Sequence, residues 1–336
     1  QAERQRVHDQ HDHWKLHEAS ADQGCHGCLR VSRVTLATED TGFGVFTYTC
    51  RMLGRFVGIL IHGQVLMALS ASCLLLITSM LLDLRLEAGW YLAAALGVWG
   101  LHVLDGVRSC LVEDARSQPV RSAFTVQHIV PLSVMGWSAL CLSVLVSLLM
   151  EPGLLGLLVL LLLGLLVVSY LVPLFTPSKW SLKSLGLVKT PAVVVAWVLG
   201  GVILPVVSSG HVDVPWLDVL VLCLLVSSLL LVDCLVLDSR DIEADAERGI
   251  RTIAVRLGPG DTMVICWISV GIAVLAGAVA GAIIDARWSV VALVMIVPMI
   301  VAIAVAGCTM PGEVRLVSLV LSWRIIGAVA ALIMFP

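Results

Sequence analysis

Long apolar segments recur along the chain, and they restrict its fold more than any other feature. Nine segments are each close to the roughly 20 mostly apolar residues that a helix needs to cross the hydrocarbon core of a bilayer. Hydrophobic residues make up 59% of the 336 residues and charged residues only 13%, which excludes an ordinary soluble domain. The sequence therefore predicts an all-α integral membrane bundle of about nine transmembrane helices. The expected spans are 56–82, 88–105, 124–150, 153–175, 190–209, 214–237, 262–284, 287–308 and 315–335.

Basic residues divide the predicted loops into two sets. The loops after the second, fourth and sixth apolar segments are rich in Arg and Lys, whereas the intervening loops carry mainly Asp and Glu. Because short loops rich in Lys and Arg remain on the cytoplasmic side, these three loops and the N-terminus are expected in the cytoplasm. A net charge of -3 gives no reason to expect a nucleic acid as partner, so the lipid bilayer is the first partner to consider.

The first 50 residues differ from the rest of the chain. They are polar, and we expect residues 1–50 to form a flexible cytoplasmic tail and residues 51–336 to form the transmembrane domain. Cys25 and Cys28 form a CxxC pair among several histidines, which suggests zinc. A second Cys or His pair that would complete a tetrahedral site is missing, so a polar tail with incidental Cys and His is the preferred interpretation.

A dense cluster of charged residues follows the sixth apolar segment. Asp238, Asp241 and Asp245 are spaced so that they share one face if the helix continues through the cluster. They could then converge on a hard divalent cation such as Mg²⁺, which usually carries phosphate. Three carboxylates at a helix end are more often a solvated cap, but the spacing, the following Arg251 and Thr252 and the position at the membrane favour metal and diphosphate binding.

The segment 238–258, DSRDIEADAERGIRTIAVRLG, resembles the second aspartate-rich motif of the UbiA superfamily of intramembrane prenyltransferases. Asp238, Asp241 and Asp245 match its acidic positions, and Gly249 and Arg251 match its glycine and basic tail. The resemblance covers about residues 50–336. It implies a helical bundle in which Mg²⁺ ions, held by two acidic motifs, clamp an isoprenyl diphosphate, with the three aspartates in a catalytic role.

The loop after the second apolar segment departs from the first acidic motif of that family. Aligned on Pro119 and Arg121, it keeps one acidic position, Asp114, with Glu113 beside it. The family's other acidic positions are occupied by residues without a charge, although Asp105 lies about one turn earlier. We therefore expect Glu113 and Asp114 to supply a reduced cation site in this loop.

Basic residues near both motifs are candidates for binding the diphosphate. Guanidinium groups match the geometry of phosphate oxygens, and an ammonium group is a compact positive charge. The lysines before the fifth segment, Lys179, Lys183 and Lys189, are explained first by membrane topology, and Lys183 is the best diphosphate candidate among them. The predicted diphosphate ligands are Arg116, Arg121, Lys183 and Arg251.

Three further polar residues are candidates for lining a cavity. Asp105 ends the second apolar segment, and Tyr170 either faces substrate or belongs to the aromatic belt at the membrane surface. Asp233 lies inside the sixth apolar segment, where an ionisable group is costly unless it faces a polar cavity. Arg324 in the ninth segment raises the same question, and a structural ion pair is the preferred interpretation.

Three functions remain open at this point. The favoured one is Mg²⁺-dependent transfer of a prenyl group from an isoprenyl diphosphate to an acceptor, such as a hydrophobic aromatic compound or a quinone precursor. The second is intramolecular cyclisation with release of diphosphate, as in UbiA-type terpene cyclases, whose first motif is also modified and can carry a Glu-Asp pair. The third is a noncatalytic membrane protein that binds lipid and has a degenerate site.

Overall fold

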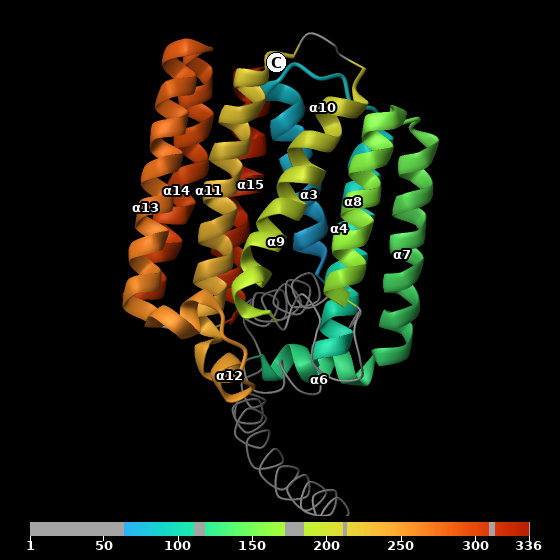
Figure 1. The fold of residues 1–336 in the computed structure, drawn as a ribbon, viewed down its shortest axis with the longest axis vertical. Helices are drawn as coiled ribbons and strands as arrows, with labels where there is room; N and C mark the ends of the chain where they lie inside the picture. The colour runs from blue at the N-terminus through green and yellow to red at the C-terminus, as the bar shows by residue number, and fades with distance from the viewer. Residues whose placement is uncertain (1–63, 111–117, 172–184, 211–213, 309–312, 336) are drawn as a thin grey trace, which may run out of the picture. The chain divides into compact units, whose positions relative to one another are not determined.

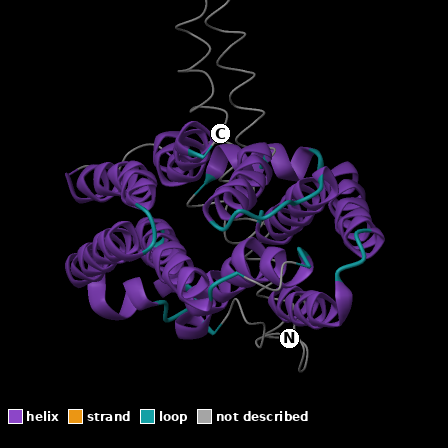
Figure 2. Cartoon of the chain, turned by 90° about the horizontal axis from the view of Figure 1, so that it is seen from above, coloured by secondary structure: helices purple, strands orange, loops and turns teal. Residues whose placement is uncertain are grey.

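Every regular element in the described part of the chain is a helix (Figures 1 and 2). The computed structural model describes residues 64–110, 118–171, 185–210, 214–308 and 313–335, so the predicted boundary at residue 50 and the Cys25–Cys28 pair lie outside the described residues. The helices are α3 (Val65–Leu81), α4 (Ala88–Ser109), α6 (Pro119–Gln127), α7 (Ile129–Leu149), α8 (Gly153–Leu171), α9 (Gly186–Val198), the π-helix η2 (Leu199–Ile203), α10 (Leu204–Ser208), α11 (Trp216–Arg240), α12 (Ile242–Glu247), α13 (Ile253–Ile283), α14 (Ala286–Cys308) and α15 (Glu313–Met334).

Each of the nine predicted apolar segments coincides with a helix or a run of helices. Seven spans among the described residues are long and apolar enough to cross a membrane, and α9, η2 and α10 together form one of them. The first and last predicted segments correspond to the shorter apolar helix α3 and to the apolar part of α15, Val320–Met334. The prediction of an all-α, multi-pass membrane bundle is confirmed.

The burial of the helices identifies α11 as the centre of the bundle. Its leucines at 222, 229 and 235 are fully buried, and α11 packs most extensively against α13. By contrast, α8 exposes Leu154, Leu155 and Leu161, each by more than 60% of its surface. Such an apolar outer surface is expected where side chains face lipid, because hydrocarbon imposes no cost on them.

Small residues let helices approach closely at two places. A Cβ atom on Gly100 of α4 would lie 2.7 Å from the carbonyl oxygen of Gly136 in α7. A Cβ atom on Gly201 of η2 would lie 2.4 Å from Leu74 of α3, and the Thr78 hydroxyl donates a hydrogen bond of 2.7 Å to the Gly201 carbonyl oxygen. Close packing at small residues is typical of membrane helices.

The chain changes direction twice after α11. Asp241 has φ −94° and ψ 8°, which ends α11, and the short helix α12 follows. Gly249 then adopts φ +72°, a left-handed conformation that favours glycine. The next helix, α13, begins at Ile253, ahead of the predicted apolar span 262–284, and Thr252 caps it. Gly258, with φ +79°, kinks this helix just before Pro259.

Candidate functional site

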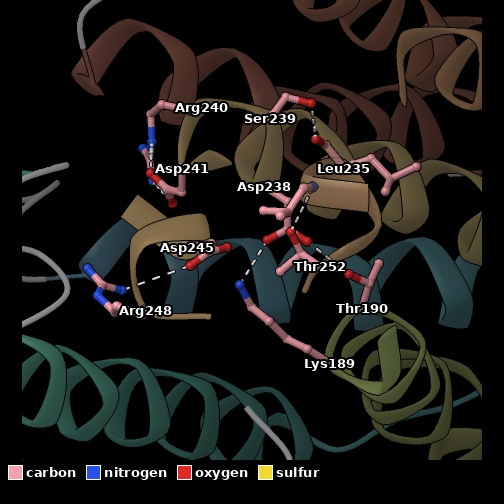
Figure 3. Close-up of polar contacts among 11 residues, drawn as sticks. Lys189, Thr190, Leu235, Asp238, Ser239, Arg240, Asp241, Asp245, Arg248 and Thr252 are labelled. Carbon is pink, nitrogen blue, oxygen red and sulfur yellow. Dashed lines mark hydrogen bonds and ion pairs between the residues drawn. The ribbon is translucent and has the colours of Figure 1, made fainter. Parts of the chain in front are cut away.

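The acidic motif lies at the end of the bundle that carries α6, α12 and the first turn of α9 (Figure 1). Asp238 belongs to the last turn of α11, Asp241 lies between α11 and α12, and Asp245 belongs to α12. The condition that one helix continues through all three aspartates is not met, since α11 ends at Arg240. Each carboxylate therefore has its own surroundings, which Figure 3 shows.

Asp238 is held by two side chains from the start of α9 (Figure 3). The Lys189 ammonium donates to Asp238 Oδ1 at 2.8 Å, and the Thr190 hydroxyl donates to Oδ2 at 2.9 Å. Asp238 is buried, with 5% of its surface exposed. Both carboxylate oxygens thus have a partner, and the negative charge is compensated inside the protein.

A close backbone contact fixes Lys189 opposite Asp238. A Cβ atom on Gly186, the first residue of α9, would lie 2.3 Å from the Arg251 carbonyl carbon and 2.5 Å from the Thr252 nitrogen. Only glycine permits this approach. Thr252 is fully buried and caps α13 by accepting a hydrogen bond of 3.2 Å from the Val255 amide. The first turn of α9 is therefore packed directly on the basic tail of the motif.

Asp241 is paired with its sequence neighbour. Arg240 Nε donates to Asp241 Oδ1 and Arg240 Nη2 donates to Oδ2, each at 2.8 Å (Figure 3). Two parallel bonds of this kind are the strong geometry of an arginine and carboxylate pair. Since about a fifth of the Asp241 side chain is exposed, this carboxylate remains accessible from outside the bundle.

Asp245 is the aspartate with an uncompensated oxygen. Its Oδ1 lies 3.9 Å from Arg248 Nη1, whereas its buried Oδ2 has no hydrogen-bond partner among the described residues. Burial raises the pKa of Asp245 to about 6, with smaller contributions from Asp238 and Asp241, while Lys189 and Arg248 oppose the increase. A buried carboxylate oxygen without a donor is costly, and a bound cation would remove that cost. This carboxylate therefore fits a metal ligand.

The three aspartates do not form a ready ligand set by themselves. In the described ranges, no group of three or more His, Cys, Asp or Glu side chains is close enough to hold a metal ion. The other predicted metal ligands, Glu113 and Asp114, lie outside the described residues, as do Arg116 and Lys183. The complete ligand set stays a prediction.

Of the predicted diphosphate ligands, Arg121 and Arg251 are described. Arg121 Nη1 donates to Gln118 Oε1 at 2.9 Å, and a Cβ atom on Gly106 would lie 2.8 Å from Arg121 Nη2. Arg121 therefore occupies the space beside the last turn of α4 that a larger residue at position 106 would fill. Arg251 is exposed at the motif end of the bundle.

Two of the predicted cavity-lining residues lie in the last turns of their helices. Asp105 is half-buried in the last turns of α4. Tyr170 is half-buried in the last turn of α8 and interacts electrostatically with Lys189. A role of Tyr170 in facing the substrate stays a prediction.

Asp233 lies in the interior of the bundle and pairs with Arg324 of α15. The Trp323 Nε1–H also donates to its two oxygens, at 3.1 and 3.0 Å. The Arg324 guanidinium lies 4.5 Å from the ring centroid of Trp197 and 4.7 Å from that of Trp323. The preferred interpretation of Arg324 as a member of a structural ion pair is confirmed.

The structure adds one residue that the sequence interpretation assigned to topology. Lys189 lies in the first turn of α9 and contacts Asp238, 49 positions further along the chain. The sequence offers one indication that Lys189 lies at a special position. It follows Gly186 closely, at the start of an apolar segment. The partner itself is visible only in the folded chain.

The fold and the motif together define a multi-pass helical bundle with an acidic cluster at one end. A sequence model of the UbiA prenyltransferase family matches residues 113–317, more than half of the chain. The chain belongs to the UbiA prenyltransferase family. Among curated protein sequences, none matches this chain significantly.

Solved structures of UbiA homologues share the fold. The chain is similar to a UbiA homologue from Archaeoglobus fulgidus bound to GPP and Mg²⁺, with a TM-score of 0.59 and 15% identity over 82% of this chain and 98% of that chain. A UbiA homologue from Archaeoglobus fulgidus bound to DMAPP and Mg²⁺ gives a TM-score of 0.58 and 14% identity, over 82% of this chain and 97% of that chain. An apo UbiA homologue from Aeropyrum pernix K1 gives 0.56 and 17%, over 79% and 97%.

Proposed function

We propose that this chain is a Mg²⁺-dependent membrane enzyme that ionises an isoprenyl diphosphate and transfers the prenyl group to a hydrophobic acceptor. The observation that carries the proposal is the buried Asp245 Oδ2, which has no hydrogen-bond partner within the described residues and lies at the motif end of the bundle. Two similar structures, bound to GPP or DMAPP with Mg²⁺, support the choice of ligands. The acceptor is proposed to be an aromatic compound or a quinone precursor.

Some of the proposed ligands bind the metal and others bind the diphosphate. Asp245 is the first metal ligand, with Asp241, Asp238, Asp114 and Glu113 as the further candidates. When bound, Mg²⁺ neutralises the diphosphate and makes it a better leaving group.

Basic side chains complete the proposed site. Arg121 and Arg251 are proposed to bind diphosphate oxygens, together with Arg116 and Lys183. The apolar bundle keeps water away from the allylic cation, which would otherwise be captured as an alcohol. The basic loops support a cytoplasmic location for this end of the bundle.

The assay that tests the proposal measures diphosphate release by the purified protein in lipid nanodiscs. A series of prenyl diphosphates is supplied with and without Mg²⁺, and with and without aromatic or quinone-precursor acceptors. Release that requires both Mg²⁺ and an acceptor supports prenyl transfer. Release with a hydrocarbon product and no acceptor would replace transfer by cyclisation, and no release from any donor would leave a lipid-binding protein without enzymatic activity.

Asp245→Asn gives the sharpest local test. The variant keeps the shape of the side chain but removes the charge, so we expect diphosphate release to fall by at least roughly 100-fold. Asp241→Asn is expected to act in the same direction. Glu243→Gln, an exposed position in the same short helix, is the matched control and should retain activity. Full activity of Asp245→Asn, with an unchanged circular dichroism spectrum, would contradict the assignment.

A further inference from the structure

A positively charged side chain of the protein, Lys189, already lies in contact with the acidic motif. The Lys189 ammonium lies 2.8 Å from Asp238 Oδ1 and interacts electrostatically with Asp245 and Tyr170 as well. About a fifth of its side chain is exposed, so the ammonium is partly shielded from solvent but still reachable. Because Lys189 already neutralises Asp238, a metal ion would have to displace the ammonium in order to bind this carboxylate oxygen.

We infer that Lys189 is a resident cation of the acidic motif: its ammonium takes the place of one divalent ion and binds a diphosphate oxygen of the substrate directly, beside a single Mg²⁺ held at Asp245. This inference rests on the proposed function. It concerns how the charge of the diphosphate is neutralised at the motif.

The distribution of charge supports one metal ion at the second motif. Asp238 has both oxygens engaged by Lys189 and Thr190, and Asp241 has both engaged by Arg240. A metal ion bound at either carboxylate would have to displace a hydrogen-bonded cation. Asp245 Oδ2, in contrast, accepts no hydrogen bond from the described residues. The carboxylate charge available for a divalent ion is therefore concentrated at one residue.

The donors of Lys189 support a direct contact with substrate. An ammonium group has three N–H donors, and within the described part of the chain Asp238 accepts from one of them. Asp238 and the packing of Gly186 against Arg251 and Thr252 fix the position of the base of the side chain. Lys189 is thus held in place with donors left over, in the neighbourhood of the basic tail that is proposed to bind the same diphosphate.

The first experiment measures binding of a prenyl thiolodiphosphate, a substrate analogue that does not ionise, in the presence of EDTA. Because a charge-assisted hydrogen bond is lost, we expect Lys189→Met to weaken this metal-independent binding by about tenfold to 100-fold. Arg256→Met, at an exposed basic residue of the first turns of α13, is the control and should bind as the wild type does.

A double variant separates substrate binding from simple neutralisation of Asp238. Lys189→Met alone leaves a buried carboxylate without its cation, so it is expected to lower the melting temperature. The double variant Lys189→Met/Asp238→Asn removes both charges and should restore the melting temperature without restoring binding of the analogue. Recovery of binding in the double variant would overturn the inference, because Lys189 would then act only on Asp238.

The second experiment counts metal ions with Mn²⁺, detected by electron paramagnetic resonance, in the presence of the analogue. We expect Asp245→Asn to remove the ion bound at the second motif, and Lys189→Met to add one ion relative to the wild type. An unchanged ion count in Lys189→Met would overturn the inference. If the wild type releases diphosphate but Lys189→Met binds analogue normally, the inference alone fails, whereas a wild type that binds no analogue even with Mg²⁺ overturns the proposed function as well.

Discussion

Asp238 and Asp245 are the same residue type at the same end of the bundle, yet their surroundings differ. Asp238 receives a hydrogen bond on each oxygen, from Lys189 and Thr190. Asp245 is equally buried but has one oxygen without a donor in the described ranges. Both oxygens of the first carboxylate are therefore satisfied by the protein, whereas one oxygen of the second is satisfied only when a cation or a proton joins it.

The raised pKa of Asp245 predicts a dependence of stability on pH in the metal-free protein. The ordinary pKa of 3.8 is raised to about 6 in the folded chain. Between these values the folded protein keeps a proton that the unfolded chain has released, so stability falls as pH rises from about 4 to about 6. The loss amounts to at most about 2 kcal/mol once screening by solvent is allowed for.

The measurement is the melting temperature in EDTA over this pH window, compared between the wild type and Asp245→Asn. The difference between the two should change with pH up to about 6 and then become constant. Added Mg²⁺ should remove the decline, because the ionised carboxylate then has a partner. Parallel curves for the two proteins in EDTA would show that Asp245 ionises normally.

At this scale the sequence offers candidate residues but does not show their partners. The acidic spacing and the basic tail identified Asp245 and Arg251 as candidates, since both follow from a local motif. The contact between Lys189 and Asp238 joins residues 49 positions apart and depends on how α9 packs. The order of residues along the sequence does not show which distant residues come into contact.

At the scale of elements, the contact between the start of α9 and the motif tail organises the site. It depends on Gly186, because an added Cβ atom would lie 2.3 Å from the backbone of Arg251. Backbone atoms move less easily than side-chain ends, so a larger residue at position 186 would displace the whole first turn of α9. The position of Lys189 follows from this contact.

Gly186→Ala is expected to displace the first turn of α9 and to separate Lys189 from Asp238. We expect a loss of about 1–3 kcal/mol in stability together with weaker binding of prenyl diphosphate. Gly164→Ala in α8 is the matched control, because a Cβ atom there meets no atom within 4 Å. Thermal unfolding measures the first effect and binding of the prenyl thiolodiphosphate measures the second, and equal behaviour of the two variants would contradict the role of the contact.

The helices themselves could be predicted because length and hydropathy are local properties. The apolar pattern stops at the polar residues on both sides of Asp241 and before residue 262, so hydropathy could not show α12 or the first turns of α13. Signals were present: Gly249 marks a left-handed residue, and Thr252 is a preferred N-cap. The π-helix η2 had no comparable local signal.

At the scale of the whole molecule, the Asp233 and Arg324 pair joins helices that are far apart in the sequence. It links α11 to α15, and Arg324 also lies against Trp197 of α9. Two nitrogens of Arg324, Nε and Nη1, have no hydrogen-bond partner in the described part of the chain. The pair therefore contributes less to stability than a fully satisfied network would, but breaking it leaves an isolated charge.

Arg324→Met is expected to lower the free energy of unfolding by about 3–5 kcal/mol, because Asp233 remains buried without its cation. The double variant Asp233→Leu/Arg324→Met should be close to the wild type, since two apolar side chains then fill the same space. Unfolding of the detergent-solubilised protein by increasing sodium dodecyl sulfate compares the three. A single variant as stable as the wild type would show that the ion pair is not structural.

The kink at Gly258 also separates two parts of α13 mechanically. A change in the backbone dihedrals of this one residue reorients Ile253–Leu257 while the longer part of the helix stays among its neighbours. The part of α13 before the kink is capped by Thr252, which packs against Gly186 of α9, whereas the part after the kink packs within the bundle. A substitution on one side of Gly258 is therefore expected to leave the packing on the other side largely unchanged.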